Sequence, residues 1–190
     1  YIVSSVNTIR QFFHAVPGKK MEVFDAESDV VVYDVSKKEI LSKSSLITKD
    51  AYETFPSFSP DGKWLYFCSA PALKMPEKYN QLRYSLSRVP FDAANGTIGS
   101  QVDTLVHADS ISVSFPRMSP DGNFMMYTET AYGQFPIWHK DAEIRMIDLR
   151  SGRQTEMGQV NSEDTESYHS WSSNSRWFVV SSRRETGVYT

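Results

Sequence analysis

The stretch Phe55–Ser69, FPSFSPDGKWLYFCS, determines what the rest of this chain can form. A near copy, FPRMSPDGNFMMYT, begins at Phe115, and a more divergent third copy, YHSWSSNSRWFVVSS, begins at Tyr168. Each copy places a short turn between two apolar runs. Repeats of fixed form at wide spacing are typical of solenoids, arrays and propellers.

The turn at the centre of the repeat has a defined chemistry. In Ser59-Pro60-Asp61-Gly62 the fixed φ of proline suits the second position of a type I turn, and glycine takes the fourth position, where a positive φ is often needed. Such a turn can close a hairpin. The third copy, SSNS at 172–175, lacks both proline and glycine. We therefore expect its turn to be the loosest of the three.

The strand that follows each turn is predicted to be buried on both faces. The runs WLYF at 64–67, FMMY at 124–127 and WFVV at 177–180 are apolar at successive positions. A sheet with one wet face would alternate apolar and polar residues, whereas a continuous run fits a strand between two layers. A propeller blade is a sheet of this kind, packed between two neighbouring blades.

Other segments supply the remaining strands of a four-strand unit. Third strands are predicted near 30–35, 82–89 and 143–149, each followed by a polar turn, and short polar fourth strands near 40, 102–106 and 154–157. Polar, short strands suit the outer edge of a sheet, because they resist pairing with other molecules. Loops at 71–79 and 131–139 are insertions between second and third strands, so they should project from the same rim.

The fold class predicted is all-β: one β-propeller domain over 1–190, with about four blades of four antiparallel strands. Residues 1–29 form a divergent portion of the first blade, with strands at 8–13 and 21–24 that turn at Pro17-Gly18. Residues 30–48 complete that blade, 49–108 form the second, 109–160 the third and 161–190 the start of the fourth. Since 187–190 resembles the beginning of a third strand, we expect the chain to be part of a larger propeller of roughly six to eight blades.

The composition and motif content of the sequence argue against several classes of protein. The formal net charge of −3 argues against nucleic-acid binding, which favours a basic surface. A hydrophobic content of 40% is enough for a core and argues against disorder. No apolar run approaches the ~20 residues of a membrane span. The single cysteine, Cys68, excludes an internal disulfide and a cysteine-based metal site. No nucleophile elbow, phosphate loop or dinucleotide fingerprint occurs, so neither a catalytic residue nor a cofactor is predicted.

Carboxylates recur in the links that lead from one predicted blade to the next. In a propeller these links lie on one rim beside the central channel, so three of them would place several acids around one mouth. Such a cluster could hold a hard cation or attract a basic peptide; alternatively, these are solvated loop charges. The candidates are Asp50, Glu53, Asp109, Asp164 and Glu166, with His169, which replaces the proline of the other two copies, as a sixth.

The second inserted loop is a separate candidate. Tyr132, Phe135 and Trp138 lie within eight residues of one another beside His139. Exposed aromatic side chains favour contact with a protein partner or a sugar. The alternative is that they cap the blade as a local hydrophobic cluster.

The Ser-Pro-Asp-Gly repeats resemble those of the TolB-type propeller family. The match is good at 56–67 and 116–127 and partial at 169–180, and with the intervening strands it covers roughly 30–190. The overall sequence, especially 7–35, is similar to exported TolB-like proteins of Bacteroidetes. The resemblance implies a periplasmic or exported protein that acts as a scaffold, binds a protein or another envelope component, and has no catalytic activity. The same repeats occur in propellers attached to prolyl-oligopeptidase-type serine peptidases, so a propeller that gates a hydrolase is an alternative. A carbohydrate-binding propeller is a third possibility. The sequence leaves the oligomeric state open.

Overall fold

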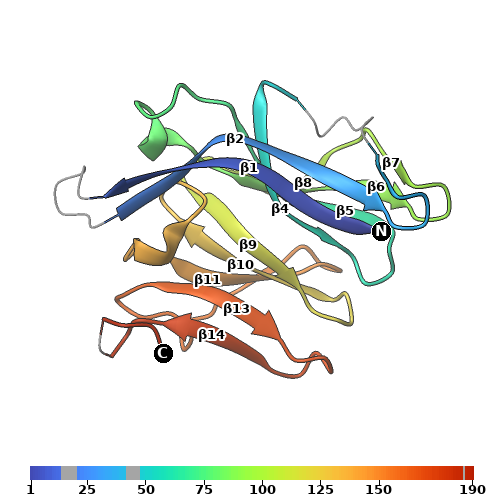
Figure 1. The fold of residues 1–190 in the computed structure, drawn as a ribbon. Coiled ribbons are helices and arrows are strands. Elements are labelled where there is room, and N and C mark those ends of the chain that lie inside the picture. Colours follow the sequence, from blue (N-terminus) through green and yellow to red (C-terminus); the bar gives the residue numbers. More distant parts are fainter. Residues whose placement is uncertain (14–20, 42–47, 186) are drawn as a thin grey trace.

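The computed structural model describes residues 1–13, 21–41, 48–185 and 187–190. Nearly all of its regular structure is antiparallel β, as the sequence predicted. Four sheets follow one another in chain order, from the blue N-terminal hairpin to the red C-terminal strands (Figure 1). This arrangement is that of a partial β-propeller.

Each sheet is a separate antiparallel unit. The first contains β1 (Ile2–Phe13), β2 (Met21–Asp34) and β3 (Glu39–Ile40). The second contains β4 (Ala51–Phe58), β5 (Trp64–Pro71), β6 (Ser85–Asp92), β7 (Thr97–Ile98) and β8 (Asp103–Val106). The third contains β9 (Ser112–Met118), β10 (Phe124–Thr130), β11 (Glu143–Asp148) and β12 (Gln154–Thr155), and the last contains β13 (Glu166–Trp171) and β14 (Phe178–Ser182). Two short 3₁₀ helices, η1 (Tyr79–Gln81) and η2 (Pro136–Trp138), lie in the inserted loops.

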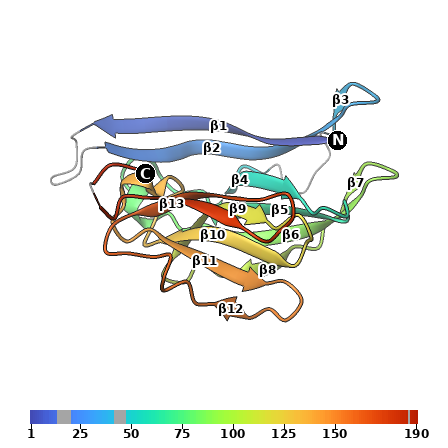
Figure 2. The same ribbon diagram turned by 90° about the horizontal axis from the view of Figure 1, so that it is seen from below.

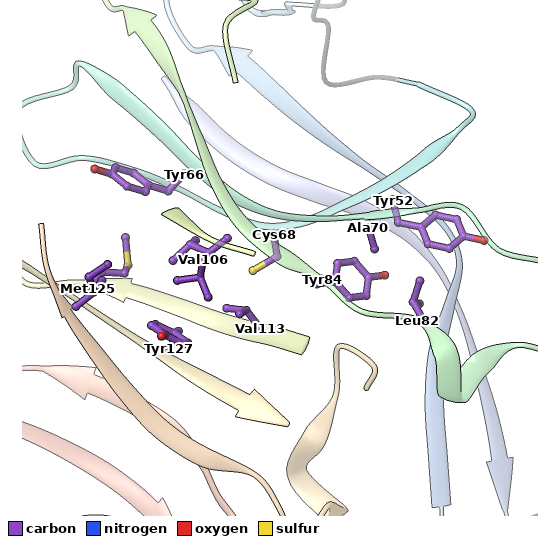
Figure 3. Packing of buried hydrophobic residues seen from close by; sticks show 12 residues of the cluster. Tyr52, Tyr66, Cys68, Ala70, Leu82, Tyr84, Val106, Val113, Met125 and Tyr127 are labelled. Carbon is purple, nitrogen blue, oxygen red and sulfur yellow. The ribbon is translucent and has the colours of Figure 1, made fainter. Parts of the chain in front are cut away.

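Strand β5 is buried on both faces, as its continuous apolar run predicted. Leu65 and Phe67 pack with Val30 and Val32 of the first sheet. Tyr66 and Cys68, which alternate with them along the strand, face the third sheet and pack with residues such as Met125 (Figure 3). Period-two alternation therefore distributes one apolar run between two interfaces. This alternation explains why Cys68 is fully buried and why burial raises the pKa of its thiol.

The last sheet departs from this pattern. Phe178 and Val180 of β14 pack against the third sheet, but Trp177 is 73% exposed and Val179 is 69% exposed. The expectation that this run is buried on both faces is therefore wrong for the described residues. The physical reason is that no described segment packs on the outer face of β14.

The three repeat turns share one hydrogen-bond pattern. In the first, Ser59 Oγ donates to Asp61 Oδ1 at 2.6 Å and accepts from the Trp64 amide at 3.0 Å, while Gly62 takes φ = 70°. The second turn has the same bonds. The third turn also keeps them, with Asn174 in place of aspartate and Ser175 at φ = 59° in place of glycine. The hydrogen bonds of the third turn are therefore no looser than those of the other two. The third turn differs in its backbone instead, because Ser175, a non-glycine residue, takes the unfavourable left-handed conformation.

The N-terminal region differs from the predicted strand assignment. Strands expected at 21–24 and 30–35 are one continuous 14-residue strand, β2, so the boundary drawn between residues 29 and 30 falls inside it. Its partner β1 begins at Ile2 rather than at Thr8. The turn assigned to Pro17-Gly18 lies outside the described residues. This long hairpin lies next to β4 of the second sheet (Figure 1 and Figure 2).

At the C-terminus, Thr190 exchanges two backbone hydrogen bonds with Ser182 of β14, at 3.0 and 3.2 Å. This pairing is what the start of a third strand would show. None of the described helices is long and apolar enough to cross a membrane.

Candidate binding surface at the loop end

Strand direction places the candidate residues at one end of the sheets. The first strand of each repeat runs from a between-sheet link to a Ser-Pro-Asp-Gly-type turn, and the second strand returns. The inserted loops at 72–84 and 131–142 therefore lie at the same end as the links. We call this end, with its links and inserted loops, the loop end. Both 3₁₀ helices lie there (Figure 1).

An aromatic row joins the first strands of three sheets. Phe55 and Phe115 each sit at a bulge in their strand, with φ = 51° and 52° respectively. Their ring centroids are 4.7 Å apart, and Tyr168 of β13 continues the row at 4.8 Å from Phe115. A left-handed bulge re-aims a side chain out of the strand's alternation. The phenylalanine of the Phe-Pro pair thus makes a contact between neighbouring sheets. Tyr168, at the end of the row, is 46% exposed.

The second inserted loop contributes to this row. Phe135 lies 6.2 Å from Phe115, and η2 packs against β13. Trp138 is 39% exposed, with the Arg183 guanidinium 5.2 Å from its ring centroid. We call these five aromatic residues, Phe55, Phe115, Phe135, Trp138 and Tyr168, the inner rim.

Tyr132 of the same loop is engaged differently. Its ring lies 4.7 Å from His139 and 5.9 Å from Tyr79 of the first inserted loop. Its hydroxyl donates to Glu22 Oε1 at 2.9 Å. Tyr132 is therefore engaged by other residues of the protein, whereas the ring of Trp138 keeps an exposed face.

Glu53 and Glu166 occupy equivalent positions, two residues before the aromatic member of their repeat, but their surroundings are opposite. Glu53 is buried, and its Oε2 has no hydrogen-bond partner among the described residues. Burial, together with the nearby charge of Asp29, raises the pKa of Glu53 to about 7. Glu166 is also buried, but it accepts hydrogen bonds from the Ser162 and Ser182 hydroxyls at 2.6 and 2.7 Å.

The other predicted candidates are scattered along the loop end. Asp50 and Asp109 are exposed in separate links. Asp164 caps the Thr165 amide at 2.8 Å, a bond that lowers its pKa. His169 is buried, and burial lowers its pKa; its Nδ1 lies 2.9 Å from the Ser167 carbonyl oxygen.

No hydrogen bond or ion pair joins any two of the six predicted residues within the described ranges. Those ranges also contain no group of three or more His, Cys, Asp or Glu side chains placed to hold a metal ion. The six residues lie at the loop end, in the separate links and strands described above.

A buried polar network was missed by the sequence analysis. Asp25 accepts from Asn7 at 3.0 Å and from the Tyr84 hydroxyl at 2.9 Å, and burial raises its pKa. Glu22, three residues earlier, lies 3.3 Å from His139 Nε2. These contacts fasten the hairpin to the second and third sheets. The only sequence signal was two acids inside the otherwise apolar stretch MEVFDA at 21–26.

Comparison with known proteins supports the fold alone. No protein-family model and no curated protein matches this chain. A puromycin hydrolase S511A mutant complexed with PGG is similar in structure, with a TM-score of 0.51 and 14% identity over 94% of this chain and 27% of that chain. A second puromycin hydrolase structure has a TM-score of 0.50 and 16% identity over 98% of this chain and 30% of that chain. This chain thus spans less than a third of either protein and has the architecture of a partial β-propeller.

Proposed function

We propose that this chain is a propeller scaffold, without catalytic residues of its own, that binds a protein partner through the inner rim. The observation that carries the proposal is the aromatic row, which spans three sheets and ends in the exposed ring of Tyr168, together with the exposed ring of Trp138 on the loop that contributes Phe135 to the row. Large aromatic side chains held in place by packed neighbours are the residues that most often dominate binding energy at protein interfaces.

The setting of the two rings supports this role. Tyr168 is held at its ring face by Phe115, and Trp138 by the Arg183 guanidinium, so little side-chain entropy remains to be lost on binding. Charged groups lie beside Trp138: Arg183, which lies over its ring, also pairs with the partly exposed Asp164 at 3.9 Å. An apolar centre within a polar rim is the usual anatomy of a protein interface.

A TolB-like character and a periplasmic or exported location belong to the same proposal. Their support is the Ser-Pro-Asp-Gly repeat and its resemblance to exported propellers. Fractionation of the native cells, with the chain followed by antibody, tests the location. Recovery in the cytosolic fraction would refute it and leave the binding proposal standing.

The binding proposal is tested by a capture experiment. Immobilised wild-type chain, a Trp138→Ala/Tyr168→Ala double variant and a Trp177→Ala control are incubated with envelope extract, and bound proteins are quantified by mass spectrometry. Trp177 is a matched control because it is also an exposed aromatic residue, but next to β14. We expect at least one protein to bind the wild type and the control and to fall about tenfold or more with the double variant. Equal capture by all three would refute the proposal.

A second candidate is a propeller that gates a hydrolase located outside this chain. The similarity to two puromycin hydrolase structures favours it over a carbohydrate-binding propeller, although at 14% and 16% identity that similarity concerns fold. The full reading frame discriminates between gating and an independent scaffold. A neighbouring α/β-hydrolase domain would favour gating, and its absence would favour the independent scaffold.

A further inference from the structure

A cavity at the loop end, away from the inner rim, has an unusual charge arrangement. Its volume is about 420 Å3, and it lies between the first inserted loop and the link from the second to the third sheet. The residues lining it include three apolar ones, Pro71, Leu73 and Leu82, and two of opposite charge, Arg83 and Asp109. Pockets for small ligands have volumes of about 300–1,000 Å3 and combine apolar walls with a few polar groups.

The Arg83 guanidinium lacks a carboxylate partner among the described residues. Among the residues that the structure describes, its Nε is buried without a hydrogen-bond partner, and its Nη1 donates to the Gln81 carbonyl at 3.2 Å in an exposed position. A buried N–H donor that has no hydrogen-bond partner is costly to the folded state. By contrast, five other arginines in the described residues pair with a carboxylate: Arg88, Arg145, Arg150, Arg183 and Arg184.

The backbone holds Arg83 in this place. It lies between two fully buried residues, Leu82 and Tyr84. The Leu82 carbonyl accepts from the Gly133 amide at 2.8 Å, and the Tyr84 carbonyl accepts from the Val113 amide at 2.9 Å. The backbone on either side of Arg83 is therefore fixed by hydrogen bonds to the third sheet and its inserted loop. The position of Arg83 at the cavity is thus set before a ligand binds.

Asp109 supplies the opposite charge. Its side chain makes no hydrogen bond or ion pair with any described residue, including Arg83, although both line the same cavity. The neighbouring Ala108 amide donates to Ser85 Oγ at 3.1 Å, which ties this link to β6. Two opposite charges that share a cavity without pairing favour a ligand that carries both charges.

We propose that this cavity binds a small zwitterion with an apolar body, the chemistry of a free α-amino acid with an apolar side chain. The carboxylate of the ligand pairs with Arg83 through charge-assisted hydrogen bonds, because the guanidinium fork matches carboxylate geometry. The ammonium of the ligand faces Asp109, and its side chain lies against the accessible Pro71 and Leu73. The proposal is independent of the inner rim and stands or falls without it.

The test uses leucine as the probe, followed by chemical-shift changes in the NMR spectrum of the whole chain. Two matched compounds separate the charges: 4-methylpentanoate lacks the ammonium, and 3-methylbutylamine lacks the carboxylate. We expect leucine to bind in the millimolar range or tighter and at least about tenfold more tightly than either compound, with shifts at 82–85 and 107–109. Binding of 4-methylpentanoate as tight as that of leucine would overturn the role of Asp109, and no leucine binding would overturn the proposal.

Variants complete the test. Arg83→Gln should weaken leucine binding about tenfold or more, and Asp109→Asn should weaken it severalfold, with the fold of each variant checked by its spectrum. Arg153→Gln makes the same chemical change at an exposed position outside the cavity and should leave leucine binding unchanged. Wild-type affinity in a folded Arg83→Gln variant would refute the assignment.

Discussion

Replacing Glu53 by glutamine should stabilise this protein at alkaline pH and not at acid pH. The Glu53 carboxyl is buried without a hydrogen-bond partner for Oε2 among the described residues, and its pKa is raised to about 7 from an ordinary value of 4.5. A group with a raised pKa favours folding only while it is protonated. Between pH 4.5 and pH 7 the unfolded chain loses this proton and the folded chain keeps it, so the free energy of unfolding falls as pH rises.

The magnitude follows from the difference between these two pKa values. At 1.36 kcal/mol per pKa unit, the interval from 4.5 to about 7 corresponds to about 3 kcal/mol. Glutamine keeps the size of the side chain and removes the charge. The Glu53→Gln variant should therefore match the wild type near pH 4 and be more stable by up to about 3 kcal/mol at pH 8.

The assay is urea denaturation of both proteins at pH 4 and pH 8, followed by fluorescence. The matched control is Glu166→Gln, the equivalent position in the third repeat, where the carboxylate accepts hydrogen bonds from two serine hydroxyls and faces Arg184 at 3.5 Å. That substitution should destabilise the protein by about 1–3 kcal/mol at pH 8. If Glu53→Gln were no more stable than the wild type at pH 8, the assignment of Glu53 as a buried, unpaired acid would be wrong.

Three further predictions concern the repeat and its faces. Gly62→Ala should lower the free energy of unfolding by about 1 kcal/mol or more in urea denaturation, because Gly62 has φ = 70°; an unchanged midpoint would count against this turn. Asp34→Asn should lower the melting temperature at pH 7 but not near pH 2. Hydrogen bonds from Ser36 and Lys37 lower the pKa of Asp34 to about 2. The stability that these bonds add is therefore present above pH 3.8 and is lost as pH falls to about 2. Equal loss of melting temperature at both pH values would contradict this. Trp177→Ala should change the free energy of unfolding by less than about 0.5 kcal/mol, whereas Phe178→Ala should cost about 2 kcal/mol, since only Phe178 faces the third sheet; similar costs would show that the two faces of β14 are wrongly assigned.

The repeated part of the fold was predictable because its determinants are local. The Ser-Pro-Asp-Gly turn and the apolar run after it specify a hairpin within about fifteen residues, and the run's burial on both faces at β5 follows from apolar residues at successive positions. The short strand at Asp103–Val106 was also found from local polarity, since it lies within the predicted 102–106.

The N-terminal hairpin was not predictable in the same way. The segment FDAESD at 24–29 is rich in polar residues and was interpreted as a break between two strands. Strand β2 continues through this segment because it stays paired with β1, and because Tyr84, which is 59 residues away, donates a hydrogen bond to Asp25. No periodicity in the sequence encodes such pairs.

The candidate site was predicted at the level of its location only. Strand direction placed links and inserted loops on one end, but the surroundings of the carboxylates there differ: Glu166 accepts hydrogen bonds from two serine hydroxyls, whereas Glu53 Oε2 has no partner among the described residues. The sequence does not reveal the role of Phe55 and Phe115, because the Phe-Pro pair looks only like part of the apolar run that precedes the turn. Its left-handed backbone and the resulting contact between sheets depend on the neighbouring repeat.

The most direct measurement for the whole account is a map of side-chain nuclear Overhauser effects around β5. We expect Leu65 and Phe67 to contact Val30 and Val32 of the first sheet. Tyr66 and Cys68 should instead contact the region of Val113 and Met125 in the third sheet. Contacts from both sets of β5 residues to the same neighbouring sheet, or helical contacts along 64–67, would contradict the stacked-sheet architecture on which the binding surfaces depend.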